Sequence, residues 1–451
     1  MACTFVPPYL LQRLAAVDTD TTLKSSGERT LLVDDVVRSR RDAPPRTIQQ
    51  PAAPDDATRV VHDAHNTEEL PGDVARLDSD PATGDAAVDE AFDSSGQVWD
   101  LFAEQFNRRS VDGNGTALSI TVHYGQAYDN AFWDGQQLVF GDGDGEVFDR
   151  FTKPMDVMAH EFTHGVTQFT AGLAYQGQPG ALNESVSDVF AALTKQKALK
   201  QSADQANWLI GEGLFRPGIK ATALRSMVEP GSAYDDPRLG QDPQVGSMAD
   251  YVDTEEDSGG VHINSGIPNR AFALAAREIG GNSWEQAGQV WYDAITSGEV
   301  SAATDFAGFA RATVSSATRL FADDSRIAEA VRAAWTTVGV LTADQPTPAP
   351  TEQPPTPPVD VVAVRRSGGF AGIVRAGQLD LDADPEGAEV RSLLTQVDLR
   401  TLTASSPAPD RFVYTVEYGH ESATLGEQDL TPELHRVVQI VLGPRGRLDL
   451  S

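Results

Sequence analysis

Two histidines and a glutamate in the run VMAHEFTHGVTQF have the types and spacing of a catalytic metal site. On a helix, His160 and His164 lie one turn apart on the same face, so both imidazoles can bind one metal ion. Glu161, next to the first histidine, can take a proton from a metal-bound water. The pattern is short, however, and an ordinary helix with two hydrogen-bonded histidines shows it as well.

A downstream segment, GALNESVSDVF, offers the third protein ligand that a catalytic zinc needs beside one open position. Gly180 can end a loop there, and residues 183–190 can form a helix. Glu184 and Asp188 are four residues apart and share a face of that helix. We predict Glu184 as the third ligand and Asp188 as the acceptor for the free N–H of a ligand histidine. The alternative is a solvated acidic helix face.

Together these motifs, HEFTHGVTQFTAGLAYQGQPGALNESVSDVF, resemble the zinc-binding helices of the thermolysin family. The resemblance extends over most of residues 58–341, through TVHYGQAYDNAFWDGQQLVFGDGDGE and GGVHINSGIPNRAF. The N-terminal PPYLLQRLA is similar to the propeptide motif of the protealysin-like members, which have short propeptides. The resemblance implies a zinc endopeptidase of protein or peptide substrates, with one catalytic Zn²⁺ and synthesis as a zymogen.

The resemblance also implies roles for residues outside these helices. Tyr175 in AGLAYQ and His262 in GGVHINSG would donate to the oxyanion of the tetrahedral intermediate. Asp257 would hold the orientation and charge of His262. Asn130 and the main chain of Ala131 would bind an extended peptide by strand addition. The alternatives are a core aromatic residue at position 175 and a buried structural histidine at position 262.

Substrate contacts beyond the cut follow from the same resemblance. Arg225 would hydrogen-bond the carbonyl just past the cut, unless it forms only a surface salt bridge. An apolar pocket would receive the residue after the cut, and its positions here are Phe148, Phe151, Val157, Ile210 and Leu224. We therefore expect cleavage before a bulky hydrophobic residue, although apolar side chains at these positions could equally be plain core.

The sequence departs from the family at its double calcium site. Asp156 and Glu212 match two carboxylates of that site, but Lys195 and Asn207 stand where acidic ligands are expected. A lysine ammonium repels Ca²⁺ and can replace it by pairing with Asp156. The sequence therefore disfavours the full two-ion site and leaves calcium binding open. We interpret GDGDG at residues 141–145 as a tight turn, because its spacing matches no calcium loop.

The elements that must position these side chains fall into two groups. After residue 58, strand-like runs such as LSITVHYG and QQLVFGDGDGEVF alternate with turns. Later segments such as NRAFALAAREIG and SRIAEAVRAAWTTVG carry apolar residues at helical spacing. This order predicts an α+β fold, a two-lobed zincin protease with a ligand cleft between a β-rich and a helical lobe.

The length of 451 residues allows about three folding units. The predicted division is a propeptide over 1–50, a β-rich N-terminal lobe with the zinc-binding helices over 58–195, a helical C-terminal lobe over 196–341, a Pro-rich linker over 342–358, and a small α+β domain over 359–451.

The N-terminal segment holds two short amphipathic stretches, followed by a polar, Pro-rich connector. Proteolysis concentrates in exposed connectors of this kind, so we expect a maturation cut between about residues 38 and 60. Cys3, the only cysteine, lies just before the propeptide motif. Its thiolate could occupy the open position of the zinc in the precursor. The alternative is an ordinary reduced cysteine.

The C-terminal unit resembles emfourin, a small proteinaceous inhibitor of protealysin-like enzymes, chiefly in RSGGFAGIVR and DRFVYTV. The resemblance implies that the propeptide and this domain both regulate the enzyme from within the chain. A Pro-rich linker of this kind is a stiff spacer that keeps the unit close to the enzyme. A generic β-rich accessory module is the alternative.

The composition argues against some classes of binding partner. The formal net charge of -31 argues against nucleic acid, whose phosphates would be repelled. No apolar run approaches the ~20 residues of a membrane span, and the N-terminus does not have the pattern of a secretory signal. We expect a monomer without nucleic-acid or membrane partners, secreted without a recognisable signal peptide or else cytoplasmic.

Two rival functions are a metal-binding scaffold without activity and a zinc amidase acting on small molecules. A scaffold would lack the base, a ligand or an oxyanion donor, and none of these is missing. An amidase would not need the positions for a peptide backbone at Asn130 and Ala131.

Overall fold

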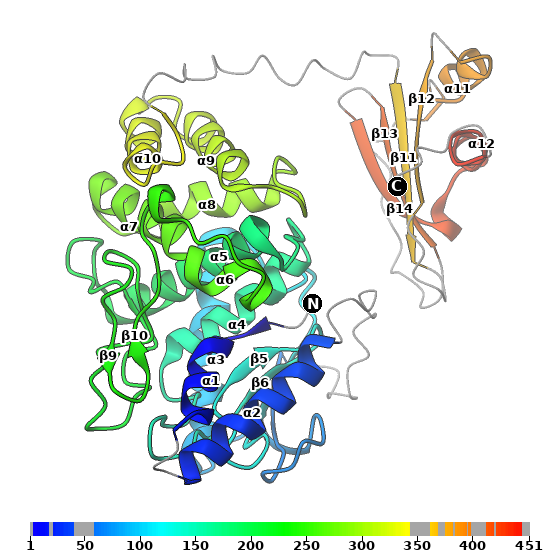
Figure 1. Ribbon diagram of the computed structural model, residues 1–451. Coiled ribbons are helices and arrows are strands. Elements are labelled where there is room, and N and C mark those ends of the chain that lie inside the picture. The colour runs from blue at the N-terminus through cyan, green and yellow to red at the C-terminus, as the bar shows by residue number, and fades with distance from the viewer. Residues whose placement is uncertain are drawn as a thin grey trace. The chain divides into compact units, whose positions relative to one another are not determined.

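The computed structural model describes residues 3–17, 21–39, 58–342, 361–368, 375–381, 384–394, 396–397, 412–418 and 421–443. The chain divides into two units, Met1–Pro346 and Thr347–Ser451 (Figure 1). The predicted connector over residues 40–57, most of the Pro-rich linker and the side chain of Cys3 lie outside the described residues.

A six-stranded sheet forms the β-rich lobe. Its strands are β1 (Cys3–Thr4), β2 (Arg59–Asp63), β3 (Asp73–Leu77), β4 (Leu118–Val122), β5 (Ala131–Trp133) and β6 (Leu138–Phe140). Their order is β1-β5-β6-β4-β2-β3. The pairs β2·β4 and β4·β6 are parallel, and the others are antiparallel. All of β4 is buried, as expected for a central strand covered on both faces. The N-terminal strand β1 thus forms one edge of the sheet and pairs with β5.

Three long helices connect this sheet to the rest of the unit. They are α3 (Ala86–Phe106), α4 (Met155–Gln168) and α5 (Gly177–Leu199). The carboxylate of Asp85 caps α3 by accepting from the N–H groups of residues 87 and 88. Phe102 of α3 lies 5.1 Å, between ring centroids, from both Phe162 of α4 and Phe190 of α5. This aromatic contact fixes the helices that carry HEFTH and NESVSD against each other.

The second lobe is mainly helical. Its helices are α6 (Asp257–Asn264), α7 (Gly266–Ile279), α8 (Ala287–Thr296), α9 (Phe306–Leu320) and α10 (Ser325–Thr337), with a 3₁₀ turn η1 (Met248–Asp250). Two short hairpins join it to α5: β7 (Leu209–Ile210) with β8 (Arg225–Ser226), and β9 (Asp235–Asp236) with β10 (Gly240–Gln241). Trp291 and Trp335 stack at its centre, 6.2 Å apart. The predicted two-lobed α+β fold is confirmed.

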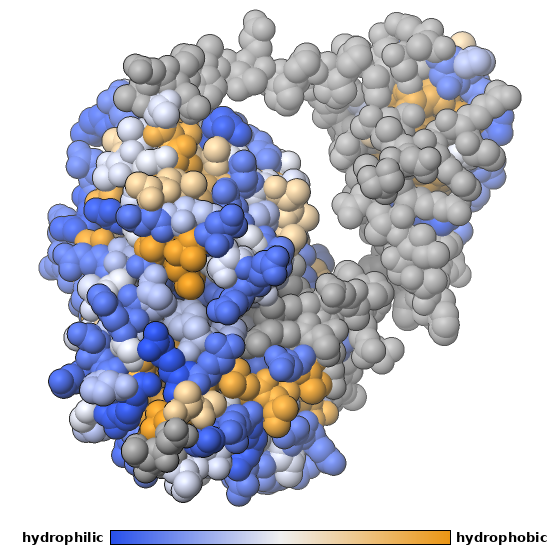
Figure 2. Space-filling model, viewed as in Figure 1, coloured by the Kyte–Doolittle hydropathy of each residue, from blue (hydrophilic) through white to orange (hydrophobic). Residues whose placement is uncertain are grey.

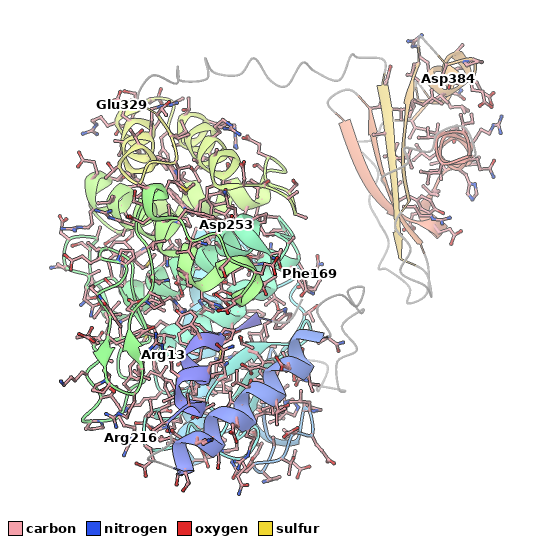
Figure 3. All side chains as sticks on the ribbon, viewed as in Figure 1. Arg13, Phe169, Arg216, Asp253, Glu329 and Asp384 are labelled. Atoms are coloured by element: carbon pink, nitrogen blue, oxygen red, sulfur yellow. The ribbon has the colours of Figure 1, made fainter. Side chains whose placement is uncertain are left out.

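The N-terminal segment continues from β1 into α1 (Pro8–Ala15) and α2 (Thr21–Ser39), which pack on each other. Gly27 permits this contact, because a Cβ there would lie 2.9 Å from the carbonyl oxygen of Leu11. Arg13 extends from α1 over Gly240, with its guanidinium where a Cβ would be (Figure 3). Leu32 and Val36 of α2 are exposed apolar residues, and Figure 2 shows apolar side chains gathered on this side of the molecule.

The C-terminal unit has a core of its own. Its strands are β11 (Val361–Gly368), β12 (Arg375–Asp380), β13 (Phe412–Tyr418) and β14 (Glu421–Gly426), and its helices are α11 (Gly387–Leu394), α12 (Pro432–Val441) and the 3₁₀ turn η3 (Glu427–Asp429). The strands form an antiparallel sheet in the order β12-β11-β13-β14. Helix α12 packs on β11 and β12, and α11 packs on α12. Val364, Val416 and Val437 are buried between the layers.

A charged junction ties the sheet to α3. His123, directly after β4, contacts Asp142 at 2.8 Å and the capping residue Asp85 at 3.2 Å. The hydrogen bond with Asp142 and the charges of both carboxylates outweigh burial and raise the pKa of His123 to about 9. A raised pKa means that folding favours the protonated ring, so this stabilisation is complete below about pH 6.5 and is lost as the pH rises through about 9.

We therefore predict that His123→Gln lowers the free energy of unfolding by about 1 kcal/mol at pH 6 and by much less at pH 10. Urea unfolding at the two pH values measures the difference. His65→Gln is the matched control, because His65 also contacts two carboxylates but its side chain is 61% exposed. Equal destabilisation by His123→Gln at both pH values would contradict the charged junction.

Candidate active site

Helices α4 and α5 bring three potential metal ligands together. His160 and His164 are buried on one face of α4, and their Nε2 atoms are 3.0 Å apart. Glu184 of α5 places Oε2 at 3.4 Å from Nε2 of His160 and Oε1 at 3.5 Å from Nε2 of His164. The side chain of Glu161 is close by as well, since ligand atoms of His160, Glu161 and His164 all lie within 4.8 Å of one another.

The donor set fits zinc. The Nδ1 atoms of the two histidines donate to oxygen atoms at 2.8 Å, that of His160 to Asp188 and that of His164 to Asn183. Both Nε2 lone pairs therefore face inward, toward each other and toward Glu184. Four-coordinate zinc with bonds of about 2.0–2.1 Å requires ligand atoms about 3.3 Å apart, which agrees with these distances. Such a trio of buried acceptors is favourable only with a cation between them.

Glu161 lies beside this cluster as a buried carboxyl group. Burial raises the pKa of Glu161 well above its usual value. Neither of its side-chain oxygens has a hydrogen-bond partner among the described residues. A buried polar group without a partner costs stability, so this position is explained better by proton transfer than by folding.

Asp188 connects the metal ligands to the helical lobe. Its carboxylate accepts hydrogen bonds of 2.8 Å from Nδ1 of His160, from Nε and Nη2 of Arg225, and from Nδ2 of Asn269. Burial by itself raises the pKa of Asp188, but Arg225 and His160 outweigh burial and lower it to about 2. Asp188 is therefore a carboxylate at every pH at which the protein would work.

The start of α6 positions the second part of the site. Asp257 and the three residues after it have positive φ, a left-handed turn that non-glycine residues rarely adopt. The turn lets Asp257 accept from the backbone N–H of His262 at 2.9 Å and from its Nδ1 at 2.7 Å. Burial lowers the pKa of His262, but Asp257 and Glu184 outweigh it, and the pKa is raised.

Tyr175 faces the same point from the loop between α4 and α5. Its hydroxyl donates to Oε1 of Glu184 and lies 3.3 Å from Nε2 of His262. The two groups predicted as oxyanion donors therefore lie next to each other and to the predicted metal ligand. Both alternatives for these positions, a core aromatic and an isolated structural histidine, explain the arrangement less well.

The chain's own N-terminus occupies the cleft. Phe5 donates its N–H to the carbonyl oxygen of Ala131 at 3.0 Å, which extends the pairing of β1 with β5. Val6 donates its N–H to Oδ1 of Asn130 at 2.7 Å. Arg225 donates to the carbonyl oxygen of Phe5 at 3.2 Å. The residues predicted to hold a substrate backbone thus hold the chain's own backbone.

The side chain of Phe5 points into the apolar region beside the metal ligands. Its ring lies 5.1 Å from the ring of His160, and a Cβ at Gly211 would lie 3.5 Å from it. The five residues predicted to line the pocket are fully buried and belong to the same core cluster as Phe5: Phe148, Phe151, Val157, Ile210 and Leu224.

Lys195 stands among the residues that match the calcium site. Its ammonium lies 2.9 Å from Oε2 of Glu212, 3.5 Å from Oδ2 of Asp156 and 3.1 Å from the carbonyl oxygen of Leu209. Asn207 donates to the same oxygen of Glu212 at 2.8 Å. A protein cation thus occupies the place between the carboxylates.

One expectation is wrong, and several contacts were missed. Gly180 does not end a loop but lies inside α5, where a Cβ would be 2.5 Å from Cγ1 of Val261. The sequence reasoning did not assign Asn183, which precedes Glu184 and binds His164, or Asn269, which binds Asp188. The i, i+4 spacing of Asn183 and Ser187 was a usable signal, since Oγ of Ser187 also lies 3.1 Å from His164.

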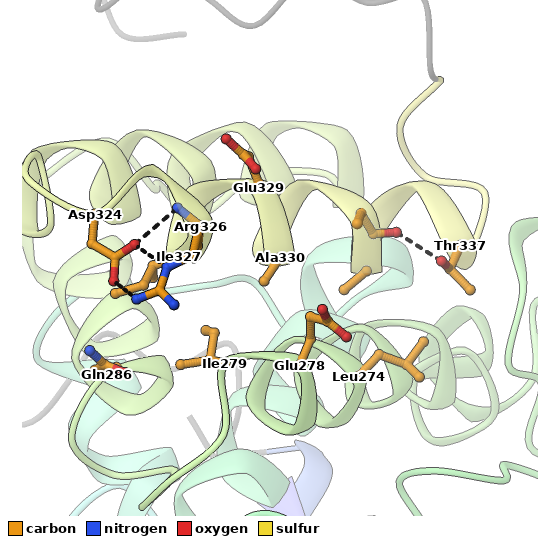
Figure 4. Close-up of a pocket in the computed structure, with 12 residues that line it drawn as sticks. Leu274, Glu278, Ile279, Gln286, Asp324, Arg326, Ile327, Glu329, Ala330 and Thr337 are labelled. Atoms are coloured by element: carbon orange, nitrogen blue, oxygen red, sulfur yellow. Dashed lines mark hydrogen bonds and ion pairs between the residues drawn. The ribbon is translucent and has the colours of Figure 1, made fainter.

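A separate hollow of about 550 Å³ lies between α7 and α10 (Figure 4). Leu274, Ile279 and Ala330 line it, and the paired side chains of Asp324 and Arg326 lie at its edge. It contains none of the residues predicted for the site.

Comparison with known proteins agrees with this geometry. The family descriptions "Thermolysin metallopeptidase, catalytic domain" and "Thermolysin metallopeptidase, alpha-helical domain" match residues 53–168 and 171–340, and "Emfourin" matches residues 364–442. The chain is 48% identical over 338 residues to the extracellular metalloprotease of Pectobacterium carotovorum subsp. carotovorum, which covers 75% of this chain and 96% of that protein. It is 43% identical over 347 residues to protease PrtS of a Photorhabdus strain, with 75% and 92% covered.

A solved structure leads to the same family. The precursor of protealysin, a metalloproteinase from Serratia proteamaculans, superimposes with a TM-score of 0.68 at 48% identity, covering 75% of this chain and all of that one. Fold and site together define a two-lobed metallopeptidase. The chain belongs to the thermolysin family, whose members depend on zinc, and carries an emfourin domain at its C-terminal end.

Two substitutions separate the proposed base from the proposed ligand. Glu161→Gln should keep zinc and lower peptide cleavage by at least about 100-fold, because it removes only the base. Glu184→Ala should lower the zinc content itself, because it removes one of three protein ligands. Atomic absorption measures the zinc, and peptide hydrolysis measures the activity. Turnover of Glu161→Gln within tenfold of wild type, or full zinc in Glu184→Ala, would refute the respective role.

Proposed function

We propose that this metalloprotease is an endopeptidase that cuts before bulky hydrophobic residues and is made as a zymogen. The observation that carries the proposal is the placement of Phe5, whose backbone contacts Ala131 and Arg225 while its ring lies against His160. A bulky apolar side chain therefore fits the position just past the cut. The similar solved structure is itself described as a precursor.

His160, His164 and Glu184 would hold the zinc, which when bound supplies Lewis acidity to a water and to the scissile carbonyl. Glu161 takes a proton from the water and passes it to the leaving nitrogen. His262 and Tyr175 donate to the oxygen of the scissile carbonyl as negative charge develops on it.

Substrate backbone is held by three groups of this chain. Asn130 and Ala131 bind it as an added strand, and Arg225 binds the carbonyl after the cut. Asp188 keeps Arg225 and His160 in place through their shared hydrogen bonds. A wrongly placed guanidinium would otherwise lie buried and unpaired in the cleft.

In the zymogen, α2 locks the N-terminal segment onto the edge of the cleft. Oγ of Ser26 donates to Oδ2 of Asp129 at 2.5 Å, and Oγ1 of Thr30 accepts from the N–H of Asp129 at 3.1 Å. Asp34 accepts from the hydroxyl of Tyr128 at 2.6 Å and from Nδ2 of Asn130 at 2.9 Å. These residues are spaced by four, so one face of α2 contacts residues 128–130, directly before strand β5.

The calcium site is replaced by an internal cation. The ammonium of Lys195 satisfies Glu212 and Asp156 directly, and a Ca²⁺ ion there would meet a like charge. Stability should accordingly depend little on calcium.

The emfourin domain would restrain the mature enzyme. A tethered partner acts at roughly millimolar effective concentration when its linker spans the distance, so even weak affinity suffices. The core of this unit is formed by described residues between 362 and 441, which is consistent with independent folding.

Export is also part of the proposal, since a relative is named as extracellular. Among the described residues, no helix is long and apolar enough to span a membrane.

The truncation that ends at Leu341 tests this restraint. We expect this mature form to be at least several-fold more active than the mature form with the tail, and residues 359–451 added separately should inhibit it. Initial rates with a peptide substrate measure both effects. A tail variant with Val416→Asp, which disrupts its core, is the control and should not inhibit. Equal activity of both forms, together with no binding by the isolated tail, would exclude self-inhibition.

A further inference from the structure

The N-terminal segment lies in the cleft with the direction and contacts of a substrate. Cys3 and Thr4 pair antiparallel with Trp133 and Phe132 of the edge strand β5. Beyond them, the backbone of Val6 bonds the side-chain amide of Asn130 twice, at 2.7 and 3.2 Å. A segment that merely plugged the cleft would not need this continuous backbone pairing.

Two side chains fix the register of this segment. Nε2 of His262 donates to the carbonyl oxygen of Thr4 at 3.0 Å. Arg225 donates to the next carbonyl oxygen, that of Phe5, at 3.2 Å. In the proposed function, His262 marks the carbonyl that is attacked and Arg225 marks the carbonyl just past the cut. The Thr4–Phe5 peptide bond satisfies both conditions.

From this register we infer that the enzyme cuts its own propeptide between Thr4 and Phe5 before the propeptide is released. The inference rests on the proposed function. Water adds its oxygen to the carbonyl carbon of Thr4, the bond from this carbon to the nitrogen of Phe5 breaks, and the nitrogen takes up both protons of the water. The products are a short peptide that ends in the Thr4 carboxylate and a chain that begins with the Phe5 ammonium.

The anchors of the propeptide explain why this cut does not by itself free the cleft. The contacts of Phe5, Val6, α1 and α2 with the enzyme all lie on the C-terminal side of the bond. On the N-terminal side, the contacts are the backbone pairing of Cys3 and Thr4 with β5 and the hydrogen bond from His262 to the carbonyl oxygen of Thr4. The short peptide therefore leaves first, and it takes with it the only cysteine of the chain. Maturation then has two ordered steps, this cut and the later loss of the remaining propeptide.

The test follows the intact full-length chain after zinc is added to zinc-free protein. Intact mass and thiol titration under denaturing conditions give the N-terminus and the cysteine content. We expect chains that begin with Phe5 and contain no thiol, formed before any shorter chain and at a rate unchanged by 100-fold dilution. The Glu161→Gln chain should keep its original N-terminus and one thiol.

Two further variants separate the cut from misfolding of the propeptide. Phe5→Leu keeps a bulky apolar side chain and should be cut within about tenfold of the wild-type rate. Phe5→Asp should be cut at least about 100-fold more slowly, because a carboxylate does not fit beside the buried apolar side chains. Equal rates for both variants would overturn the inference.

Other outcomes distinguish the inference from the proposed function. If the preparation hydrolyses an added peptide but its propeptide always keeps Thr4, the inference is wrong and the proposed function stands. A cut at Phe5 that slows with dilution comes from another molecule and also overturns the inference. If neither the added peptide nor the propeptide is hydrolysed in the presence of zinc, the proposed function itself fails.

Discussion

The buried carboxylate of Asp188 is the constraint on which the site depends. It joins α4 through His160, the β7·β8 hairpin through Arg225 and α7 through Asn269, so three separate elements meet at two oxygen atoms. Burying a carboxylate without partners would cost several kcal/mol, whereas here four donors surround it. The arrangement has a functional consequence as well. The carboxylate that orients the proposed metal ligand His160 also orients Arg225, the proposed substrate-binding guanidinium, so one group would position both the metal and the peptide.

The two halves of the cleft differ in how they are fixed. On the side of the proposed metal ligands, α3 and α4 pack through aromatic side chains such as Phe102 and Phe162. The positions of His160 and His164 relative to each other follow from their spacing on one helix. On the oxyanion side, His262 depends on a left-handed turn that begins at Asp257, a strained backbone held by hydrogen bonds to that same residue. Removing the carboxylate would therefore release strain and alter the backbone, in addition to changing the charge of the imidazole.

Local patterns allowed much of the site to be predicted, and tertiary contacts account for what was missed. The spacing of His160 and His164 is a property of one helix, and the resemblance to a known family supplied Tyr175, Arg225 and His262. Asn269 could not be found in this way, because nothing in its own helix indicates a carboxylate on another. The prediction for Gly180 was wrong for a similar reason. A glycine in a sequence more often indicates a turn or loop, whereas here the missing side chain leaves room for Val261.

The predictions for the N-terminal segment show the same limit. Its helices and the Pro-Pro motif were evident, whereas strand β1 is two residues long and pairs with residues about 130 positions away. Pairing so distant in sequence leaves no local pattern. The sequence therefore did not predict that the side chain of Phe5 packs in the same apolar cluster as the residues proposed to line the pocket.

In the proposed zymogen, competition for Asn130 would explain how such a short propeptide excludes substrates. The side-chain amide of Asn130 bonds the backbone of Val6 and also donates to the carboxylate of Asp34 on α2. An extended substrate can reproduce the first set of bonds but not the second, because the second comes from a helix that is covalently continuous with the strand. The propeptide therefore makes one interaction, the hydrogen bond between Asp34 and Asn130, that a substrate peptide of equal length cannot make. In the proposed zymogen, this advantage would last only while α2 stays covalently joined to the enzyme, so a cut after α2 would be the step that removes it.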